Sequence, residues 1–278
     1  MKRVILVRSN PVSPDPPVEK AALALTRAGY HVTVLGWDRD ADYDQKRDVL
    51  AVSGYNIDVV RFGIKAQFGG GMKKNLVPLA RFQMRLRRWL IENRAAYDIV
   101  HAFDFDTGLV SARYTKKFKK KFVYHILDYY IDSHGLRGTA LEKTIAGLEN
   151  AVINSADATL ICTEQRREQI AGSSPKRLEI IHNTPAAEQI GTADFALEAG
   201  DKVKIAYVGI LQDHRLLKEL SEAIAESDNV ELHMGGFGRY DSYFEELSKT
   251  YENIHFYGKL SYHQTLSLEQ QCDIMLAI

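Results

Sequence analysis

The first half of the chain alternates short apolar runs with longer amphipathic segments. Each apolar run is rich in β-branched residues and is bounded by turn residues, which is typical of buried strands. Strands are expected at residues 4–7, 31–37, 58–62, 98–102, 122–127, 158–162 and 178–181. Helical periodicity predicts helices at about 18–28, 72–94 and 140–154 and from about 164, the last capped by Thr163. The acidic stretch 38–48 is expected to be a solvated loop. This alternation indicates a parallel sheet covered by helices.

The second half repeats the same alternation after a polar stretch that ends near residue 201. Strands are expected at 203–208, 230–234, 254–257 and 273–277, with helices between them. Charge differs between the halves: through Phe195 there are 29 Lys and Arg against 22 Asp and Glu, and the remainder has 7 against 14. We therefore expect two domains, residues 1–195 and 196–278.

Composition narrows the class of protein. With 278 residues, 45% apolar and 26% charged, the chain has the profile of a cytoplasmic globular protein. It contains no apolar run of about 18 residues, and the apolar part of its first residues is too short for a signal peptide. Cys162 and Cys272 are too few and too far apart for a disulfide framework or a cysteine zinc site. A nucleic-acid binder would usually be more basic overall.

Two stretches of the first half offer candidate binding residues. Ser9 and Asn10 begin a loop that runs to Pro17 and contains four prolines, so it cannot form regular structure. The loop lacks the G-x-G-x-x-G pattern, which argues against dinucleotide binding. It either lines a cleft at the carboxyl end of the first strand or is an ordinary surface loop.

Other polar residues follow later strands. His101, Asp104 and Asp106 come at the end of one strand, and Asp128, Tyr129 and Tyr130 follow the next. Ligands of parallel sheets bind at such ends. His101 is either a proton carrier near neutral pH or a hydrogen-bonding group inside the fold. Asp128 and the two aromatics suit a hydroxyl-rich ligand, although each feature alone is also common in structural roles.

The stretch 203–218 is the centre of the second half. Gly209 is expected to end a strand, and a polar turn leads to a helix from Arg215 to about residue 225. Free backbone N–H groups at a helix start attract anions, and Arg215 there predicts a phosphate contact. Gly235, Gly236 and Gly238 would let backbone approach a ligand closely. The alternative is an ordinary strand–helix unit with a surface arginine.

The predicted helix Met72–Arg94 is basic along one side and apolar along the other. Its apolar positions are Leu76, Leu79, Phe82, Leu86, Trp89 and Leu90. Such a helix either rests on an anionic membrane surface or packs on the core with its charged side in solvent. The glycines at 69–71 just before it predict a hinge or binding loop. A lysine cluster at 116–121 adds a second basic surface.

Several motifs, in this order and spacing, resemble those of GT-B glycosyltransferases, most closely glycosyltransferase family 4. In the second half they are K-I-A-Y-V-G at 204–209, L-H-M-G-G-F-G at 232–238, I-H-F-Y-G at 254–258 and C-D-I-M-L-A at 272–277. In the first half they are D-I-V-H-A-F-D at 98–104 and I-I-H-N-T-P at 180–185, the latter with Asn183 matched. The resemblance covers nearly the whole chain.

The resemblance implies an α/β fold of two Rossmann-like domains that face a cleft. The second would be incomplete, because the family's paired-glutamate motif and returning C-terminal helix are not in the sequence. The sugar nucleotide would bind the second domain through the glycines, Arg215 and Lys218, the last because Ile210 stands where the family has a second cation. Asp104 and His101 would serve catalysis on the acceptor side and Arg215 on the donor side, although Phe103 replaces a common histidine. Ser9, Asn10, Asp128 and Asn183 would line the acceptor cleft.

The expected function is therefore transfer of a hexose from a donor such as UDP- or GDP-hexose to a glycan or glycolipid, with retention and without a metal or other cofactor. Cell-surface polysaccharide synthesis at the inner face of the cell membrane is the expected setting, with no nucleic acid as partner. Two alternatives stay open: a non-catalytic binding or scaffold relative that assembles with a partner, and a GT-B-fold sugar-nucleotide epimerase.

Overall fold

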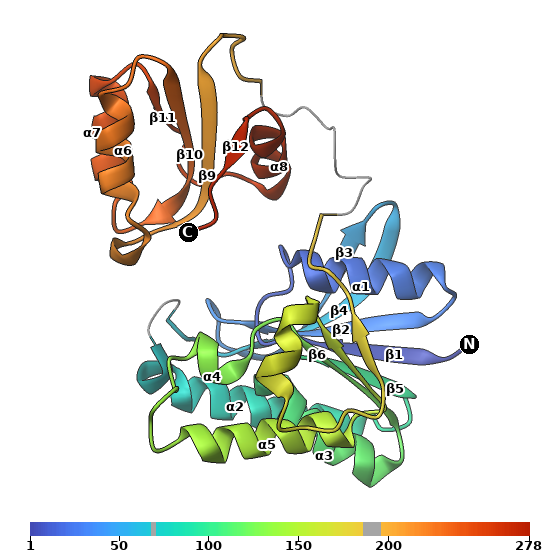
Figure 1. Cartoon of the computed structure of the whole chain (residues 1–278). Helices are drawn as coiled ribbons and strands as arrows, with labels where there is room; N and C mark the ends of the chain where they lie inside the picture. The colour runs from blue at the N-terminus through green and yellow to red at the C-terminus, as the bar shows by residue number, and fades with distance from the viewer. Residues whose placement is uncertain (68–70, 186–195) are drawn as a thin grey trace. The chain divides into compact units, whose positions relative to one another are not determined.

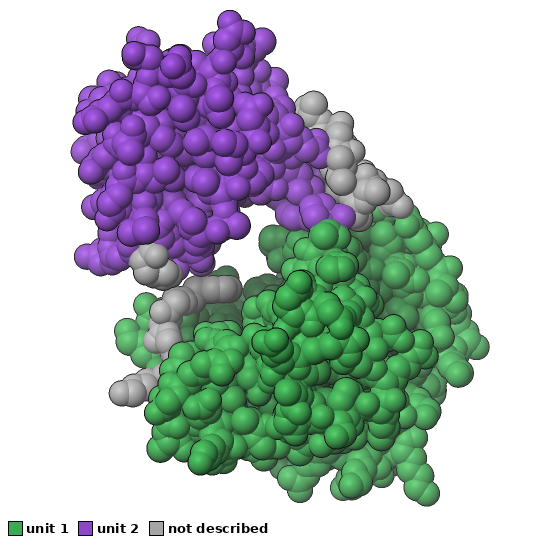
Figure 2. All heavy atoms as spheres, in the orientation of Figure 1, with its two compact units in different colours: residues 1–184 green, residues 185–278 purple. Residues whose placement is uncertain are grey.

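A computed structural model describes residues 1–67, 71–185 and 196–278. Within it the chain forms two compact units, residues 1–184 and 185–278 (Figure 2). The boundary predicted after residue 195 stays a prediction, because residues 186–195 lie outside the described ranges. Each unit is considered by itself below.

Unit 1 is built on an eight-stranded sheet with the order β3-β4-β2-β1-β5-β6-β7-β8. Its strands are β1 (Arg3–Val7), β2 (His31–Asp38), β3 (Tyr43–Val52), β4 (Tyr55–Gly63), β5 (Ile99–Phe103), β6 (Lys121–Ile126), β7 (Ala158–Ile161) and β8 (Leu178–Ile180). Neighbours pair in parallel except β3, which is antiparallel to β4. The chain winds outward from β1 in one direction and from β5 in the other, so β1 and β5 meet at a topological switch point.

Helices cover both faces of this sheet (Figure 1). They are α1 (Pro16–Arg27), α2 (Gly71–Glu92), α3 (Asp104–Phe118), α4 (Tyr130–Ser133), α5 (Glu142–Ser155) and the 3₁₀ helix η1 (Glu164–Ile170). Alternation along β1 sends Val4 and Leu6 into the core beneath α1 and Ile5 and Val7 into the core beneath α2, α3 and α5. Burial on both faces explains the continuous apolar runs of the inner strands.

Unit 2 is a smaller four-stranded parallel sheet with the order β11-β10-β9-β12. Its strands are β9 (Val203–Leu211), β10 (Val230–Gly238), β11 (Ile254–Phe256) and β12 (Ile274–Met275), and its helices are η3 (Asp213–Arg215), α6 (Leu217–Ala225), α7 (Asp241–Thr250) and α8 (Tyr262–Gln270). Leu232, Met234 and Ile254 of the sheet pack with Ile224 of α6 and Phe244 of α7. A second switch point lies between β9 and β12.

The prediction of an α/β fold with parallel sheets is confirmed, and each predicted strand is present. Helix α3 was not predicted, because small polar residues occupy the buried face where apolar ones would reveal the period. Thr107, Ser111 and Thr115 are all buried. The Thr107 and Thr115 hydroxyls donate to the carbonyls of Phe103 and Ser111, at 2.6 and 2.7 Å. Both buried hydroxyl groups therefore have hydrogen-bond partners four residues back along the chain.

Other details of the sequence prediction are wrong. The stretch 38–48, expected to be a loop, contributes to edge strand β3, whose charged side chains face solvent and hide its strand character. Gly209 does not end its strand, because β9 continues to Leu211. The Thr163 side chain makes no capping bond, and a 3₁₀ helix follows it. Of the expected glycine loop, residues 68–70 lie outside the described ranges, and Gly71 begins α2.

Helix α2 packs on the core much as its pattern indicates. Phe82, Leu86 and Leu90 are fully buried, whereas Leu76, expected on the same face, is 60% exposed. Its charged side is paired with acidic residues: Arg85 forms an ion pair with Asp44, and Arg88 Nε lies 3.0 Å from Glu92 Oε1. These contacts favour the core-packing interpretation. In the described ranges no helix has both the length and the apolar character needed to cross a membrane.

Glu149 of α5 gives unit 1 a testable pH dependence. Its side chain is fully buried and accepts a hydrogen bond of 2.9 Å from the Tyr124 hydroxyl. Burial raises the pKa of Glu149 from 4.5 to about 7, so the folded state holds a proton that the unfolded state has released. The free energy of unfolding should therefore fall by up to about 3 kcal/mol as pH rises from 4.5 to 7.

We predict that Glu149→Gln removes this fall in the free energy of unfolding between pH 4.5 and 7. The difference in unfolding free energy between the variant and the wild-type chain, measured by urea denaturation at pH 4.5 to 8, should rise with pH and level off above about 7. Glu168→Gln, at an exposed glutamate of the same unit, is the matched control and should give a flat difference. A flat curve for Glu149→Gln as well would contradict the prediction.

Candidate functional site

A buried ion pair lies at the switch point of unit 1. Arg8 directly follows β1 and Asp104 directly follows β5, and the two side chains form an ion pair. Arg8 Nε also lies 2.9 Å from Asp15 Oδ2. The other carboxylate oxygen of Asp104 accepts the backbone N–H groups of Leu127, at 2.8 Å, and Asp128, at 3.1 Å. One carboxylate thus joins the carboxyl ends of β1, β5 and β6.

Asp104 is strained as well as buried. Its φ is +60°, a conformation that non-glycine residues adopt rarely and that often marks functional sites. Burial raises the pKa of Asp104, while Arg8 and the two backbone N–H groups act in the opposite direction. Since both of its oxygens are already engaged, this geometry suits Asp104 to positioning the neighbouring loops.

The proline-rich loop is held by side chains and is more than a surface connection. Ser9 Oγ donates to Asp106 Oδ2 at 3.1 Å, and Asn10 Nδ2 donates to Asp15 Oδ2 at 2.5 Å. Asp15 in turn caps α1 by accepting the Val18 N–H at 3.2 Å. Ser9 and Asp15 are both buried. The loop therefore has a fixed shape at the carboxyl edge of the sheet.

A cavity of about 330 Å³ opens beside this network, and we call it the carboxyl-edge cavity. It is lined by Arg8, Pro14, Asp15, Pro16, Pro17, Leu127, Asp128, Cys162, Arg166 and Asn183. The Asp128 side chain is 66% exposed, and Arg166 Nη2 lies 3.8 Å from its carboxylate. Guanidinium and carboxylate groups around one opening can bind a ligand that has hydroxyl or anionic groups.

His101 lies deeper than the sequence prediction placed it. Its Nε2 is 3.3 Å from His125 Nδ1, and its ring stacks on Phe103 at 4.6 Å. Burial lowers the pKa of His101 well below 6.5, with a further contribution from His125. Burial likewise lowers the pKa of His125 to about 4. Both imidazoles are therefore neutral at pH 7, which favours the internal hydrogen-bonding role for His101.

The two histidines line a second cavity, of about 200 Å³, on the α1 side of the sheet. Lys20, His182 and Asn183 are also part of its lining, and Asn183 is shared with the carboxyl-edge cavity. The structure thus joins Asn10 to Asp104 through Asp15 and Arg8, while Ser9 bonds separately to Asp106. Asp128 and Asn183 lie at the neighbouring opening, and His101 belongs to the adjacent cavity.

Sequence reasoning missed three side chains of this site: Arg8, Asp15 and Arg166. Arg8 had a detectable signal, because it is the first residue after a strand and precedes the proline-rich loop. Asp15 stands in the position of a helix N-cap, a second signal. Arg166, whose guanidinium donates to the Leu127 carbonyl, lies in η1, and nothing in its sequence context distinguishes it from other exposed arginines.

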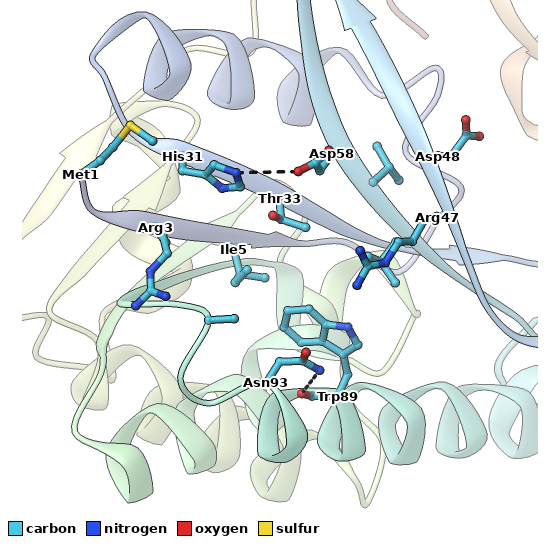
Figure 3. Close-up of a pocket in the computed structure, with 13 residues that line it drawn as sticks. Met1, Arg3, Ile5, His31, Thr33, Arg47, Asp48, Asp58, Trp89 and Asn93 are labelled. Carbon is cyan, nitrogen blue, oxygen red and sulfur yellow. Dashed lines mark hydrogen bonds and ion pairs between the residues drawn. The ribbon is translucent and has the colours of Figure 1, made fainter.

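A larger cavity, of about 420 Å³, lies at the opposite ends of the strands (Figure 3). Met1, Arg3, His31 and Thr33 line it at the amino ends of β1 and β2. Its polar groups have partners already: Arg3 pairs with Asp98 at 3.0 Å, and the Asn93 amide donates to the Trp89 carbonyl at 3.0 Å. Because ligands of such sheets bind at carboxyl ends, we place the functional site at the smaller carboxyl-edge cavity.

The glycines of unit 2 serve close packing between two strands. Gly236 has φ +150°, and a Cβ on it would lie 1.9 Å from the Gly209 carbonyl oxygen. Gly238 has φ +153°, and its Cβ would lie 2.4 Å from the Leu211 carbonyl oxygen. These two glycines therefore allow β10 to approach β9. A Cβ on Gly235 would likewise lie 2.5 Å from Cδ1 of Leu260.

Several cations lie around this glycine edge. Arg215 is in η3, ahead of α6, and its guanidinium donates to the Ile278 carbonyl while its Nε is buried without a hydrogen-bond partner. The Lys218 ammonium stands over the rings of Tyr240 and Tyr243, at 4.1 and 4.7 Å. Arg239, which sequence reasoning missed, pairs with Asp213 at 2.6 Å. The edge thus combines these cations with two acidic side chains, Asp213 and Asp241, and the Asp241 carboxylate accepts the Gly238 N–H at 2.7 Å.

We predict that Gly236→Ala disrupts unit 2. The added methyl group meets the backbone of β9, and alanine does not readily adopt φ +150°, so the free energy of unfolding should fall by about 2 kcal/mol or more. Thermal or urea denaturation measures the change. Gly200→Ala is the control, because a Cβ there meets nothing within 4 Å. Equal stability of the two variants would contradict the assigned packing role.

Comparison with known proteins identifies the family. The sequence profile of the glycosyl transferase 4-like domain matches residues 17–184. No curated protein matches the chain at the required significance.

Solved structures resemble the whole chain. Sucrose-phosphate synthase from Thermosynechococcus elongatus is 16% identical, with a TM-score of 0.67 over 97% of this chain and 73% of that protein. The structure titled "Trehalose-6-phosphate from E. coli bound with UDP-2-fluoro glucose" is 12% identical, with a TM-score of 0.66 over 99% and 77%. UDP-GlcNAc 2-epimerase from Methanocaldococcus jannaschii is 13% identical, with a TM-score of 0.63 over 99% and 78%.

At these identities the structural likeness is evidence of fold alone, and it confirms the predicted GT-B fold. The profile match extends over more than half of the sequence, and its range includes Asp104 and Asp128. The chain therefore belongs to the glycosyl transferase 4-like family.

Proposed function

We propose that the protein is a glycosyltransferase that moves a hexose from a nucleotide-sugar donor to a hydroxyl group of a glycan or glycolipid, with retention of configuration. The observation that carries this proposal is the cationic, glycine-lined carboxyl edge of β9 and β10. There, Arg215 lies on the turn that follows β9 and has a buried Nε without a hydrogen-bond partner. Family membership supports the reaction class.

Unit 2 would bind the donor at this edge. The diphosphate gains negative charge as it leaves, so prearranged cations and N–H groups stabilise the transition state more than the bound donor. Arg215 would supply a guanidinium, and Lys218 would join it by leaving the two tyrosine rings. Two structurally similar proteins have uridine sugar nucleotides in their titles, which favours UDP over GDP as the donor nucleotide. The proposed step uses no metal ion.

Unit 1 would bind the acceptor in the carboxyl-edge cavity. Asp128 is the exposed carboxylate there and can accept a hydrogen bond from an acceptor hydroxyl. Arg8 and Arg166 can donate to ring hydroxyls or to a phosphate on a lipid-linked acceptor. Asp104 would act as a positioning residue, because its oxygens hold Arg8 and the backbone of Leu127 and Asp128.

We predict that Arg215→Ala weakens UDP binding by about 10- to 100-fold, the loss expected for a charge-assisted hydrogen bond. Isothermal titration calorimetry of UDP, with GDP, ADP and CMP as competitors, measures the change. Lys249→Ala, at an exposed cation on α7, is the matched control and should bind as the wild-type chain does. Unchanged affinity in Arg215→Ala would remove Arg215 from the donor site. No binding of any nucleotide would favour a scaffold role.

A sugar-nucleotide epimerase is the second candidate, since one structurally similar protein has that activity in its name. Incubation with UDP-GlcNAc in the absence of acceptor separates the two functions. An epimerase would produce a second UDP-sugar under these conditions, whereas a transferase would need an added acceptor to release UDP.

We also propose a peripheral position on an anionic membrane surface, in cell-surface polysaccharide synthesis. Helix α2 exposes Leu76, Val77 and Met84, at 60, 69 and 59%, beside its arginines. Apolar and basic side chains on one helix surface are typical of interfacial helices.

We predict co-sedimentation with anionic vesicles at low salt, and its loss in the double variant Arg85→Glu, Arg88→Glu. The expected loss follows from replacing attraction to anionic lipid by repulsion. Lys143→Glu, Lys176→Glu, at exposed lysines of the same unit, controls for the change in net charge. Equal co-sedimentation of both double variants would show that α2 is not the contact, and no co-sedimentation of the wild-type chain would exclude the membrane proposal.

A further inference from the structure

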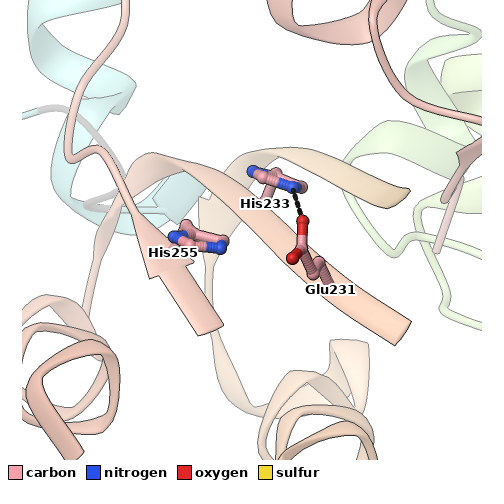
Figure 4. Close-up of side chains that lie close together, drawn as sticks. All are labelled: Glu231, His233 and His255. Carbon is pink, nitrogen blue, oxygen red and sulfur yellow. Dashed lines mark ion pairs between the residues drawn. The ribbon is translucent and has the colours of Figure 1, made fainter. Parts of the chain in front are cut away.

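Unit 2 has a cluster of metal-ligating side chains away from the donor edge (Figure 4). Glu231 and His233 are two residues apart on β10, and His255 on β11 pairs directly with His233 in the strand register. Strand alternation therefore places all three on one face of the sheet. One potential ligand atom from each residue lies within 4.8 Å of the others. Among the residues that the structure describes, no other group of three has this property.

His233 is the central member of the cluster. It is 3% exposed, and its Nδ1 lies 2.8 Å from the Tyr257 hydroxyl. Its Nε2 is buried without a hydrogen-bond partner, and Glu231 Oε2 lies 3.5 Å away, at the outer limit of a hydrogen bond. A metal-binding histidine usually coordinates the ion through one ring nitrogen and is held by a hydrogen bond at the other. Tyr257 would hold Nδ1 in this way, which leaves Nε2 for the metal.

We propose that Glu231, His233 and His255 bind one divalent transition-metal ion, of which Zn²⁺ is the best match. Two imidazoles and a carboxylate are ligands that Zn²⁺ favours, and solvent would complete a tetrahedral site. Metal–ligand bonds of about 2.0–2.2 Å place tetrahedral ligands roughly 3.3–3.5 Å apart. The distance of 3.5 Å between Glu231 Oε2 and His233 Nε2 already meets this requirement.

Metal binding requires His255 to rotate. Its ring now stacks on that of His233, with centroids 4.6 Å apart and planes 12° apart, whereas a bound metal must lie in the plane of each ring. His255 is half-buried and is the more accessible of the two histidines. The nearby cations oppose binding: Lys202 Nζ lies 4.0 Å from Glu231, and Lys204 is opposite Glu231 in the register.

The proposed site is independent of the donor site. Glu231 and His233 lie near the amino end of β10, whereas the glycine edge is at its carboxyl end. A metal held by β10 and β11 would cross-link these two strands and stabilise unit 2, because it binds the folded chain and not the unfolded one. The inference therefore does not rest on the proposed glycosyltransferase activity.

The test is metal binding itself. Titration of the full chain with ZnCl₂ in a calorimeter, and with CoCl₂ while the visible absorption of tetrahedral Co²⁺ is recorded, should give one site per chain. His255→Gln should weaken Zn²⁺ binding at least 100-fold and abolish the Co²⁺ absorption. His263→Ala, at an exposed histidine of the same unit, is the matched control and should bind like the wild-type chain.

A second variant distinguishes the loss of a metal ligand from misfolding of unit 2. Glu231→Gln keeps the shape of its side chain but removes the anionic ligand, and it should also lose the tetrahedral Co²⁺ spectrum, while its unfolding temperature without metal stays near that of the wild-type chain. Zn²⁺ should raise the unfolding temperature of the wild-type chain and of His263→Ala, but not that of His255→Gln or Glu231→Gln. Absence of Zn²⁺ binding by the wild-type chain, or equal binding by His255→Gln, would overturn the proposal.

Discussion

The reversal of winding direction between β1 and β5 is the constraint on which unit 1 depends. Because the connections leave these adjacent strands on opposite sides, the carboxyl edge opens at the point between them. Two chain segments emerge there side by side, and the Arg8–Asp104 pair joins them. An unpaired charge at such a buried position would be strongly unfavourable, so each partner depends on the other. The loops that form the cavity are held through this pair.

Unit 2 has the same kind of reversal, but different residues form its carboxyl edge. The winding direction of its strands also reverses, between β9 and β12, but its carboxyl edge is shaped by glycines. Gly236 and Gly238 let the backbone of β10 come close to that of β9, and Arg215 and Arg239 follow the ends of these strands. The candidate sites of the two units therefore both lie at the carboxyl edge of a sheet, one formed mainly by charged side chains and the other beside closely packed glycines.

The sequence predicted the sheets well, because their inner strands are apolar on both faces and stand out from the polar connections. Their position after strands also indicated that Asp104, Ser9 and Asn10 lie at the carboxyl edge, a consequence of parallel topology, whereas their roles in binding or catalysis stay predictions. The sequence could not predict that Arg8 would pair with Asp104, since that contact joins residues 96 positions apart. Three further features could not be predicted for one common reason: the burial of His101, the edge strand β3 and the Glu231–His233–His255 cluster. Each depends on which side of a strand faces solvent or a neighbouring strand, which local pattern does not reveal.

The outer edge of unit 1 is protected from pairing with other chains. Edge strand β3 presents exposed charged residues such as Lys46, Arg47 and Asp48, which discourage strand addition. Unit 1 can therefore end its eight-stranded sheet in a long exposed strand and still avoid edge-to-edge aggregation.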